Sequence, residues 1–222
     1  MATASGLEEP PATRPGRRER NKEEKRRRIV AAARHLFASK GFAQTTTQEI
    51  AEEADIGAGT LFLYVRSKED LLVMVFKDEM FETSYAAFDE ATKSAPLLDQ
   101  LLSVFEAMAA YHARDQDISR ILLKEAMFPS SPERIDDIHD LMAAIYRRMG
   151  SLVAARRQAE GLREDVDPVL AAQTMFSVYY FVLLTWLQGA ITRSEFSDRL
   201  RARLKLVVDG LHNYTPQRTA RT

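Results

Sequence analysis

The sequence of 222 residues contains no cysteine. It can therefore form no disulfide, no thiolate metal site and no cysteine nucleophile, which fits a reducing compartment. The N-terminus carries Glu8, Glu9, Pro10 and Pro11 where a signal peptide would need an apolar run. The longest apolar-rich stretch, residues 175–187, is shorter than the ~18 residues of a membrane-spanning helix. We therefore expect a cytoplasmic protein with no membrane partner.

Motifs that carry catalysis are also missing. The sequence has no Gly-x-Ser-x-Gly, no glycine-rich phosphate loop and no His-Glu-x-x-His. Its four histidines are scattered, and His139 beside Asp140 is more typical of a surface pair than of a catalytic dyad. The sequence therefore predicts that the protein is not an enzyme, with no catalytic residue, no metal site and no cofactor.

The net charge of −1 hides a local excess of positive charge. Residues 14–28 hold nine Lys and Arg against three Glu, which is the electrostatic footprint of a polyanion binder. A solvated charged tail is the alternative interpretation. Residues 1–21 are rich in Pro, Gly, Ala and charge, and we expect them to form a disordered basic arm. Its arginines, such as Arg14 and Arg20, could follow a DNA backbone or lie in a minor groove.

Residues 45–68 have the pattern of two short helices joined by a tight turn. Thr46 is a good N-cap, and Glu49 three residues later completes a capping box. Residues 55–59 then break the helix with two glycines, and residues 60–65 supply a second helix of under two turns. Such an arrangement, preceded by a helix expected at 22–39, is typical of the helix-turn-helix, whose second helix enters the DNA major groove.

Several segments of residues 22–75 resemble the N-terminal domain of tetracycline-repressor (TetR) family regulators. These segments are Ile29-Val30-Ala31-Ala32, Leu36-Phe37, Gly41-Phe42, Thr45-Thr46, Ile50-Ala51-Glu52-Glu53-Ala54, Gly59-Thr60-Leu61-Phe62-Leu63-Tyr64 and Ser67-Lys68-Glu69-Asp70-Leu71-Leu72. Three positions depart from the family pattern: Asp55 replaces a turn glycine, Gly57 replaces a Ser or Thr cap, and Phe62 replaces a tyrosine. The resemblance implies a helix-turn-helix domain at 22–68, a ligand-binding and dimerisation domain at 69–214, and a disordered tail at 215–222.

We expect DNA contacts from the ends of these short helices, through backbone amides, hydroxyls and cations. The threonines among them could equally serve only as helix caps. Because the base-reading segment is small and weakly polar, much of the affinity should come from phosphates and DNA shape. The predicted DNA-binding residues are Arg28, Thr45, Thr46, Thr47, Gln48, Gly57, Ala58, Gly59, Thr60, Leu63, Tyr64 and Lys68.

The rest of the chain is helical in pattern, and no segment alternates like a strand for long. Helices are expected at about 67–91, 97–113, 116–128, 132–158, 168–189 and 194–211. With the three helices before them they give an all-α protein of about nine helices. No internal repeat is evident.

The helix at 169–187 is apolar almost all round, and the last helix carries an apolar stripe. Both could belong to the core of one domain. We prefer a homodimer in which the pair meets its symmetry mate as a four-helix bundle, as the resemblance implies. Two reading helices would then suit a palindromic site with half-sites about 34–36 Å apart, or a multiple of that. The predicted interface residues are Val178, Phe181, Val182, Thr185, Trp186, Leu200, Leu204, Val207 and Leu211.

Methionines and aromatic residues recur along the middle helices. Such residues usually form core, but family members of this kind sense small molecules, so the resemblance favours an apolar ligand pocket. The predicted ligand-binding residues are Phe105, Met108, His112, Met127, Met142, Tyr146, Met175 and Tyr179. The resulting hypothesis is a repressor that a small, largely apolar molecule releases from its operator. The alternatives are a ligand-independent architectural DNA-binding protein and a helical small-molecule-binding module without operator function.

Overall fold

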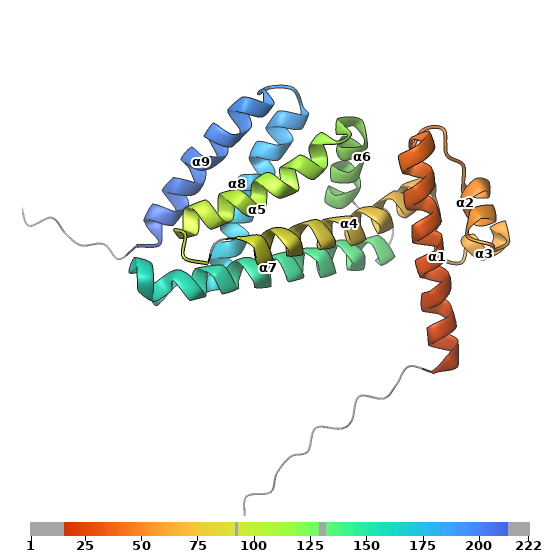
Figure 1. Ribbon diagram of the computed structural model, residues 1–222, viewed down its shortest axis with the longest axis horizontal. Coiled ribbons are helices and arrows are strands. Elements are labelled where there is room, and N and C mark those ends of the chain that lie inside the picture. The colour runs from red at the N-terminus through yellow and green to blue at the C-terminus, as the bar shows by residue number, and fades with distance from the viewer. Residues whose placement is uncertain (1–15, 92, 129–131, 213–222) are drawn as a thin grey trace, which may run out of the picture. The chain divides into compact units, whose positions relative to one another are not determined.

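The computed structural model describes residues 16–91, 93–128 and 132–212. Every regular element within these ranges is an α-helix (Figure 1). The helices are α1 Arg17–Lys40, α2 Thr47–Glu53, α3 Ala58–Leu61, α4 Lys68–Glu90, α5 Leu97–Ala113, α6 Gln116–Met127, α7 Pro132–Glu160, α8 Pro168–Leu187 and α9 Arg193–Gly210. The predicted all-α class with nine helices is therefore confirmed for the described residues. The chain divides into two compact units, Met1–Leu71 and Leu72–Thr222, and α4 contains the boundary.

Helix α1 begins earlier than we predicted. Residues 17–21, which we placed in a disordered arm, belong to the helix. The reason is local: this stretch consists mainly of Arg, Lys and Glu, which are good helix formers. In addition, Glu23 and Glu24 pair three residues on with Arg26 and Arg27, at 3.9 and 2.8 Å. The rest of the predicted arm, residues 1–15, and the predicted tail, 215–222, lie outside the described residues.

The first unit is built around a small apolar core. Ile29 and Ala33 of α1, Ile50 of α2 and Leu61 of α3 are fully buried there. The predicted capping box at the start of α2 is confirmed, because the Glu49 amide donates to Thr46 Oγ1 at 3.2 Å and the Thr46 amide donates to Glu49 Oε2 at 3.0 Å. The Lys40 ammonium and that amide lower the pKa of Glu49 to about 2.

In the second unit α8 packs against α7 and α9, and α9 also packs against α5. Helix α8 begins as predicted, with the Asp167 carboxylate accepting from the Val169 amide and Pro168 in the first turn. By length and composition α8 could cross a membrane, contrary to our estimate from residues 175–187. Its apolar composition has another explanation, since one side of it forms the core of this unit.

Candidate DNA-binding and effector sites

The turn between α2 and α3 is closed by Asp55, which has a positive φ of 52°. The Asp55 amide donates to Glu52 O and the Ile56 amide donates to Ala51 O, which is a Schellman end for α2. Asp is among the few non-glycine residues that tolerate this conformation, so it can replace the family's usual glycine.

The Arg28 guanidinium of α1 is bound to this same turn. Its Nη2 donates to the carbonyl oxygens of Ala54 and Asp55, the latter at 2.6 Å, and lies 3.0 Å from Asp55 Oδ2. Our prediction that Arg28 contacts a phosphate is therefore wrong for this structure. The side chain satisfies the free carbonyls at the end of α2, which a helix C-terminus leaves exposed.

Thr45 and Lys68 likewise hold the unit together instead of facing a duplex. The buried Thr45 hydroxyl donates to Leu36 O at 3.2 Å and to Gly41 O at 2.9 Å. Lys68 Nζ donates to the carbonyl oxygens of Phe42, Ala43 and Thr45 at 2.7, 3.2 and 3.0 Å. Both predicted contacts are corrected, because each polar group is already satisfied by backbone carbonyls that free amino acids of these types would leave to water.

The remaining predicted DNA-binding residues form an accessible surface. Helix α3 starts at Ala58 after a Gly57 cap, two residues before our prediction, and ends at Leu61. Leu63 just beyond it is 83% exposed, and Phe62, which we left out of the predicted contacts, is 52% exposed. Thr46, Gln48 and Gly59 are exposed, whereas Thr47, Ala58, Thr60 and Tyr64 are half-buried. Leu61 and Val65 face the core, as expected.

Beside this surface lies a groove of about 810 Å³ between α1 and the segment after α3. The groove is lined by Arg17, Arg18, Glu19, Asn21, Lys22, Lys25, Leu63 and Tyr64. Sequence reasoning placed the first two arginines in an arm and did not bring Lys22 and Lys25 beside Tyr64. The signal was present in the 18, 22, 25 and 29 spacing, which defines one face of a continuous helix.

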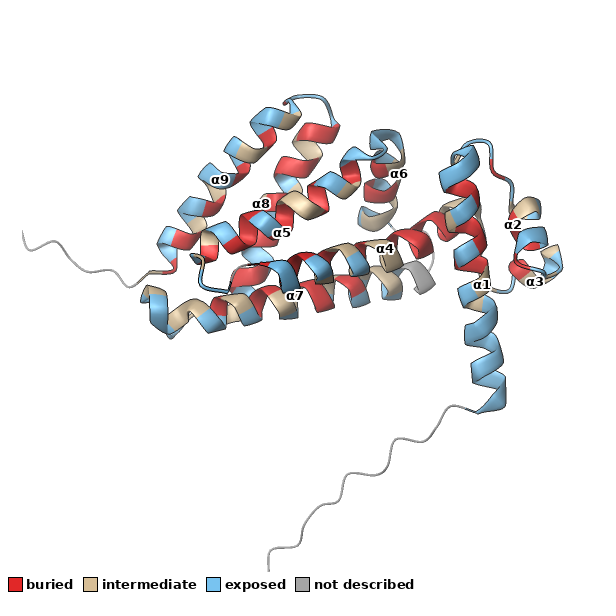
Figure 2. Cartoon of the chain, viewed as in Figure 1, coloured by how far each residue is buried: buried red, intermediate tan, exposed pale blue. Residues whose placement is uncertain are grey.

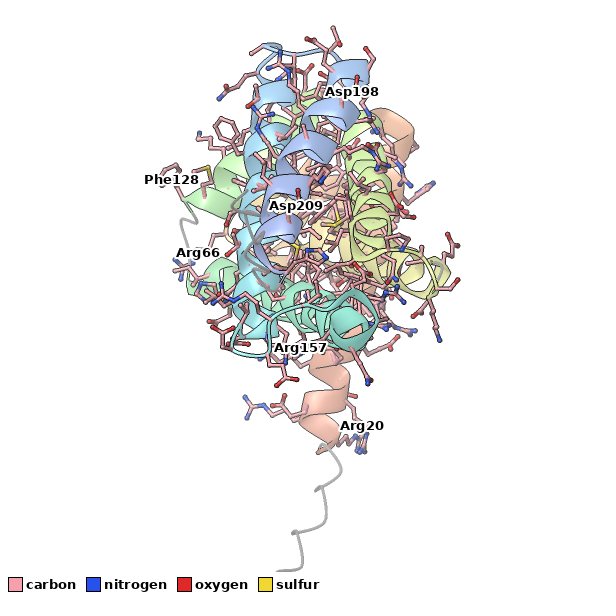
Figure 3. The ribbon with its side chains drawn as sticks, turned by 90° about the vertical axis from the view of Figure 1, so that its left-hand side faces the viewer. Arg20, Arg66, Phe128, Arg157, Asp198 and Asp209 are labelled. Atoms are coloured by element: carbon pink, nitrogen blue, oxygen red, sulfur yellow. The ribbon has the colours of Figure 1, made fainter. Side chains whose placement is uncertain are left out.

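The predicted effector residues of the second unit are mostly core. Phe105, Met108, Met175 and Tyr179 are buried, and the rings of Phe105 and Tyr179 stack with centroids 4.5 Å apart. Met142 and Tyr146 are half-buried. Met127 is 49% exposed at the end of α6, so its assignment to an interior pocket is wrong. The neighbouring Phe128 also projects at the surface (Figure 3).

Two neutral polar groups sit inside this apolar cluster. The Tyr179 hydroxyl is buried with no hydrogen-bond partner among the described residues, and burial raises its pKa far above the usual value. His112 is buried with Nδ1 3.1 Å from Ser119 Oγ, and burial lowers its pKa to about 4. At neutral pH both are therefore uncharged. The described residues contain no group of three or more His, Asp or Glu side chains placed to hold a metal ion.

The predicted dimer residues fall into two classes. Val182, Trp186, Leu200, Leu204 and Leu211 are buried within the chain, so assigning them to an interface is wrong. Val178, Thr185 and Val207 are half-buried, and Phe181 is 59% exposed. The sequence pattern did not separate the two sides of α8, because both are apolar. Leu170 at 58% exposure and Leu206 at 74% belong to the exposed apolar set that we missed.

The fold and the turn geometry define a helical regulator with a helix-turn-helix DNA-binding domain. Residues 29–75 match the family of bacterial regulatory proteins, tetR family. The chain belongs to this family of transcriptional regulators.

Relatives match well beyond the DNA-binding segment. The Fatty acid metabolism regulator protein of Bacillus subtilis is 24% identical over 83% of this chain and 94% of its own length. The HTH-type transcriptional repressor KstR2 of Rhodococcus jostii is 28% identical over 79% of this chain and 85% of its own. Among solved structures, Thermus thermophilus FadR in complex with lauroyl-CoA has a TM-score of 0.68 at 23% identity, covering 88% of this chain and all of its own. Bacillus subtilis FadR with stearoyl-CoA has a TM-score of 0.61 at 23% identity, covering 84% of this chain and all of its own.

Proposed function

We propose that this protein is a transcriptional repressor that binds a palindromic operator as a homodimer and is released by a molecule with a long apolar chain. The observation that carries the proposal is the exposed segment at α3, where Leu63 and Phe62 project beside the cationic side chains of α1. Apolar and aromatic side chains at that position can contact thymine methyl groups and the groove wall. Because the operator is chromosomal DNA, the protein acts in the cytoplasm.

The proposal of a dimer rests on the outward side of α8 and α9. Leu170 and Phe181 lie eleven residues apart, which is three turns of one helix face, and Leu206 projects from α9. Large apolar side chains gathered on one surface favour a protein–protein contact. A twofold dimer through this surface would present two reading segments to two half-sites.

The proposed effector class is a fatty acyl-CoA thioester. Two structures of similar fold hold such molecules, lauroyl-CoA and stearoyl-CoA. In this chain the apolar cluster around Phe105 and Tyr179 supplies walls suited to an acyl chain, and the unpartnered Tyr179 hydroxyl could donate to a thioester carbonyl. An unsatisfied buried polar group costs about 1–3 kcal/mol, so a bound acceptor there would be favourable.

The close packing of this cluster indicates how a ligand would act. An acyl chain can enter only if the helices around it shift, since a well-packed interior has no room to spare. Helix α4 is tied to its neighbours by Lys77 Nζ, 2.6 Å from Asp137 Oδ1 of α7, and by the Tyr111 hydroxyl of α5, 2.8 Å from Glu79 Oε2. A shift of α5 or α7 would therefore move α4, whose first residues belong to the DNA-binding unit. The ligand must prefer the shifted state, or it changes nothing.

The same close packing also favours a second candidate, a DNA-binding protein that senses no ligand. One experiment separates the two. A 40-bp duplex is selected by the protein from a random pool, and its affinity is measured by fluorescence anisotropy with lauroyl-CoA, stearoyl-CoA or free CoA present. The repressor proposal expects at least a tenfold loss of affinity with either acyl-CoA and none with CoA.

If no duplex is selected over random competitor, both candidates fail. If a duplex is selected and neither acyl-CoA weakens it, the ligand-independent binder is supported and the acyl-CoA proposal is rejected. A Tyr179→Phe variant that keeps DNA affinity but needs more acyl-CoA for release would place the phenol at the ligand.

A further inference from the structure

The N-terminal part of α1 carries a row of cations on its inner face. Stepping back from the buried Ile29 by four, three and four residues gives Lys25, Lys22 and Arg18, which share one side of the helix. Further along, this side packs into the core of the first unit; here it is exposed, and α1 extends past α2 and α3 (Figure 2). The core-facing side of α1 therefore continues as a cationic side with no protein packed on it.

The cations on this side differ from those on the other side in their pairing. Arg26 and Arg27 are held by Glu23 and Glu24 of the same helix. In contrast, Arg17, Arg18, Lys22 and Lys25 make no ion pair with any residue that the structure describes. The face that a ligand could reach in the groove is thus the one that keeps its positive charge uncompensated.

The groove brings these cations together with Tyr64, immediately after the segment that would meet a duplex. Its one acidic side chain is Glu19, against four basic ones, and the Tyr64 phenol adds a hydrogen-bond donor. A phosphodiester strand is the partner that matches this set: it is anionic, it is extended, and it would run on from the bases beside Leu63. An acidic peptide would match the charge but not the continuity with α3.

We propose that the N-terminal extension of α1 and Tyr64 together bind the phosphate backbone that flanks the half-site read by α3. Each protomer then covers more of the duplex than its helix-turn-helix alone, and the added contacts are independent of base sequence. This inference rests on the proposed DNA-binding function and adds a second, separable part to the interface.

The test compares two variants of the full-length protein with equal loss of charge on one helix. The groove variant is Arg18→Gln, Lys22→Gln and Lys25→Gln; the matched control is Arg20→Gln, Arg26→Gln and Arg27→Gln on the other side. Glutamine keeps a helix propensity close to that of Lys and Arg, and circular dichroism checks the helix content. Affinity for a 40-bp duplex selected by the wild type is measured as a function of salt.

Each phosphate contact adds about 0.9 to the slope of log affinity against log salt. The groove variant should therefore lose about 2.7 in slope per protomer, and the control much less. A duplex trimmed to the half-sites should weaken the wild type and leave the groove variant unchanged. If the groove variant fails to fold, Lys22→Gln alone should lower the slope by about 0.9 per protomer.

Failure of the inference and failure of the proposed function give different results. A wild type that binds no duplex above random competitor overturns the DNA-binding function. A wild type that binds, with a groove variant of unchanged slope, overturns only the flanking contact. Equal slope losses in both variants also overturn it, because net charge and not this groove would then set the salt dependence.

Discussion

Asp55 and Arg28 together close the end of α2. The Asp55 backbone has a positive φ, and Arg28 binds the two carbonyl oxygens that the helix end exposes. The ion pair between their side chains is worth little, because the Asp55 carboxylate is 97% exposed and the pair is screened by water. The stability of the turn therefore depends mainly on backbone conformation and on the carbonyl contacts.

This gives a prediction for position 55. Asp55→Ala should lower the free energy of unfolding by about 1 kcal/mol, because alanine has no polar side chain to ease a left-handed conformation. Asp55→Gly should be close to neutral, since glycine adopts that conformation at no steric cost. Urea unfolding followed by circular dichroism measures both. Equal effects of the two substitutions would mean that the carboxylate, not φ, matters at this turn.

His112 predicts a pH dependence. Its folded pKa of about 4 lies below the ordinary value of about 6.5, so the unfolded chain binds the proton more readily. The stability that the neutral ring allows is complete above about pH 6.5 and is lost progressively as the pH falls toward 4. Between pH 7 and pH 5 the free energy of unfolding should fall by about 2 kcal/mol from this group alone.

The measurement is urea unfolding at pH 7 and pH 5 for the wild type and for His112→Gln, whose amide can still meet Ser119. The loss between the two pH values should shrink by about 2 kcal/mol in the variant. His35→Gln is the control, because His35 is exposed, with its ring 2.6 Å from Glu53. A variant with the full wild-type pH dependence would show that His112 is not the responsible group.

At the scale of the element, α8 has two apolar sides with different uses. Met175, Tyr179, Val182 and Trp186 face the core of the second unit. Leu170 and Phe181 project from it. A hydrophobic-moment argument cannot distinguish such a helix from one buried on all sides, because the moment averages to little when both sides are apolar. The outward side is the one left for a second copy of the chain.

We therefore expect Phe181→Asp to give a monomer and to weaken operator binding by at least tenfold, because a charge would be desolvated in a dimer interface. Phe128→Asp is the matched control, since Phe128 is 73% exposed on α6 and lies outside this surface. Analytical ultracentrifugation gives the mass, and circular dichroism confirms that both variants are folded. A dimeric Phe181→Asp protein would exclude this side of α8 as the interface.

At the scale of the whole molecule, the division into two units predicts that they fail separately. Leu61→Ala removes a fully buried side chain from the small first unit, at a cost of about 2–5 kcal/mol. DNA binding should be lost, while the dimer and most of the helix content persist. Leu200→Ala removes a fully buried side chain from the second unit and should affect the dimer first. Ultracentrifugation and anisotropy on the same samples measure both; loss of the dimer in Leu61→Ala would mean that the units unfold together.

Sequence reasoning predicted the local features of this protein correctly. The nine helices, the capping box of Thr46 and Glu49, the Asp167 and Pro168 start of α8 and the inward side chains of Leu61 and Val65 were all expected. Each of these is specified within a few neighbouring residues, by a cap, a proline or a helical period. For the same reason the helix-turn-helix and its family were visible before the fold was known.

The tertiary structure decided which polar and apolar groups are still available for function. Arg28 and Lys68 looked like phosphate contacts, yet they bind carbonyl oxygens more than twenty residues away, and Lys22 and Lys25, which looked like ordinary helix surface, line a groove. Phe181 and Val182 are neighbours in sequence, but only the second is core. Burial and pairing depend on segments distant in the chain, so a local pattern identifies the elements of this protein while only their packing identifies its free surfaces.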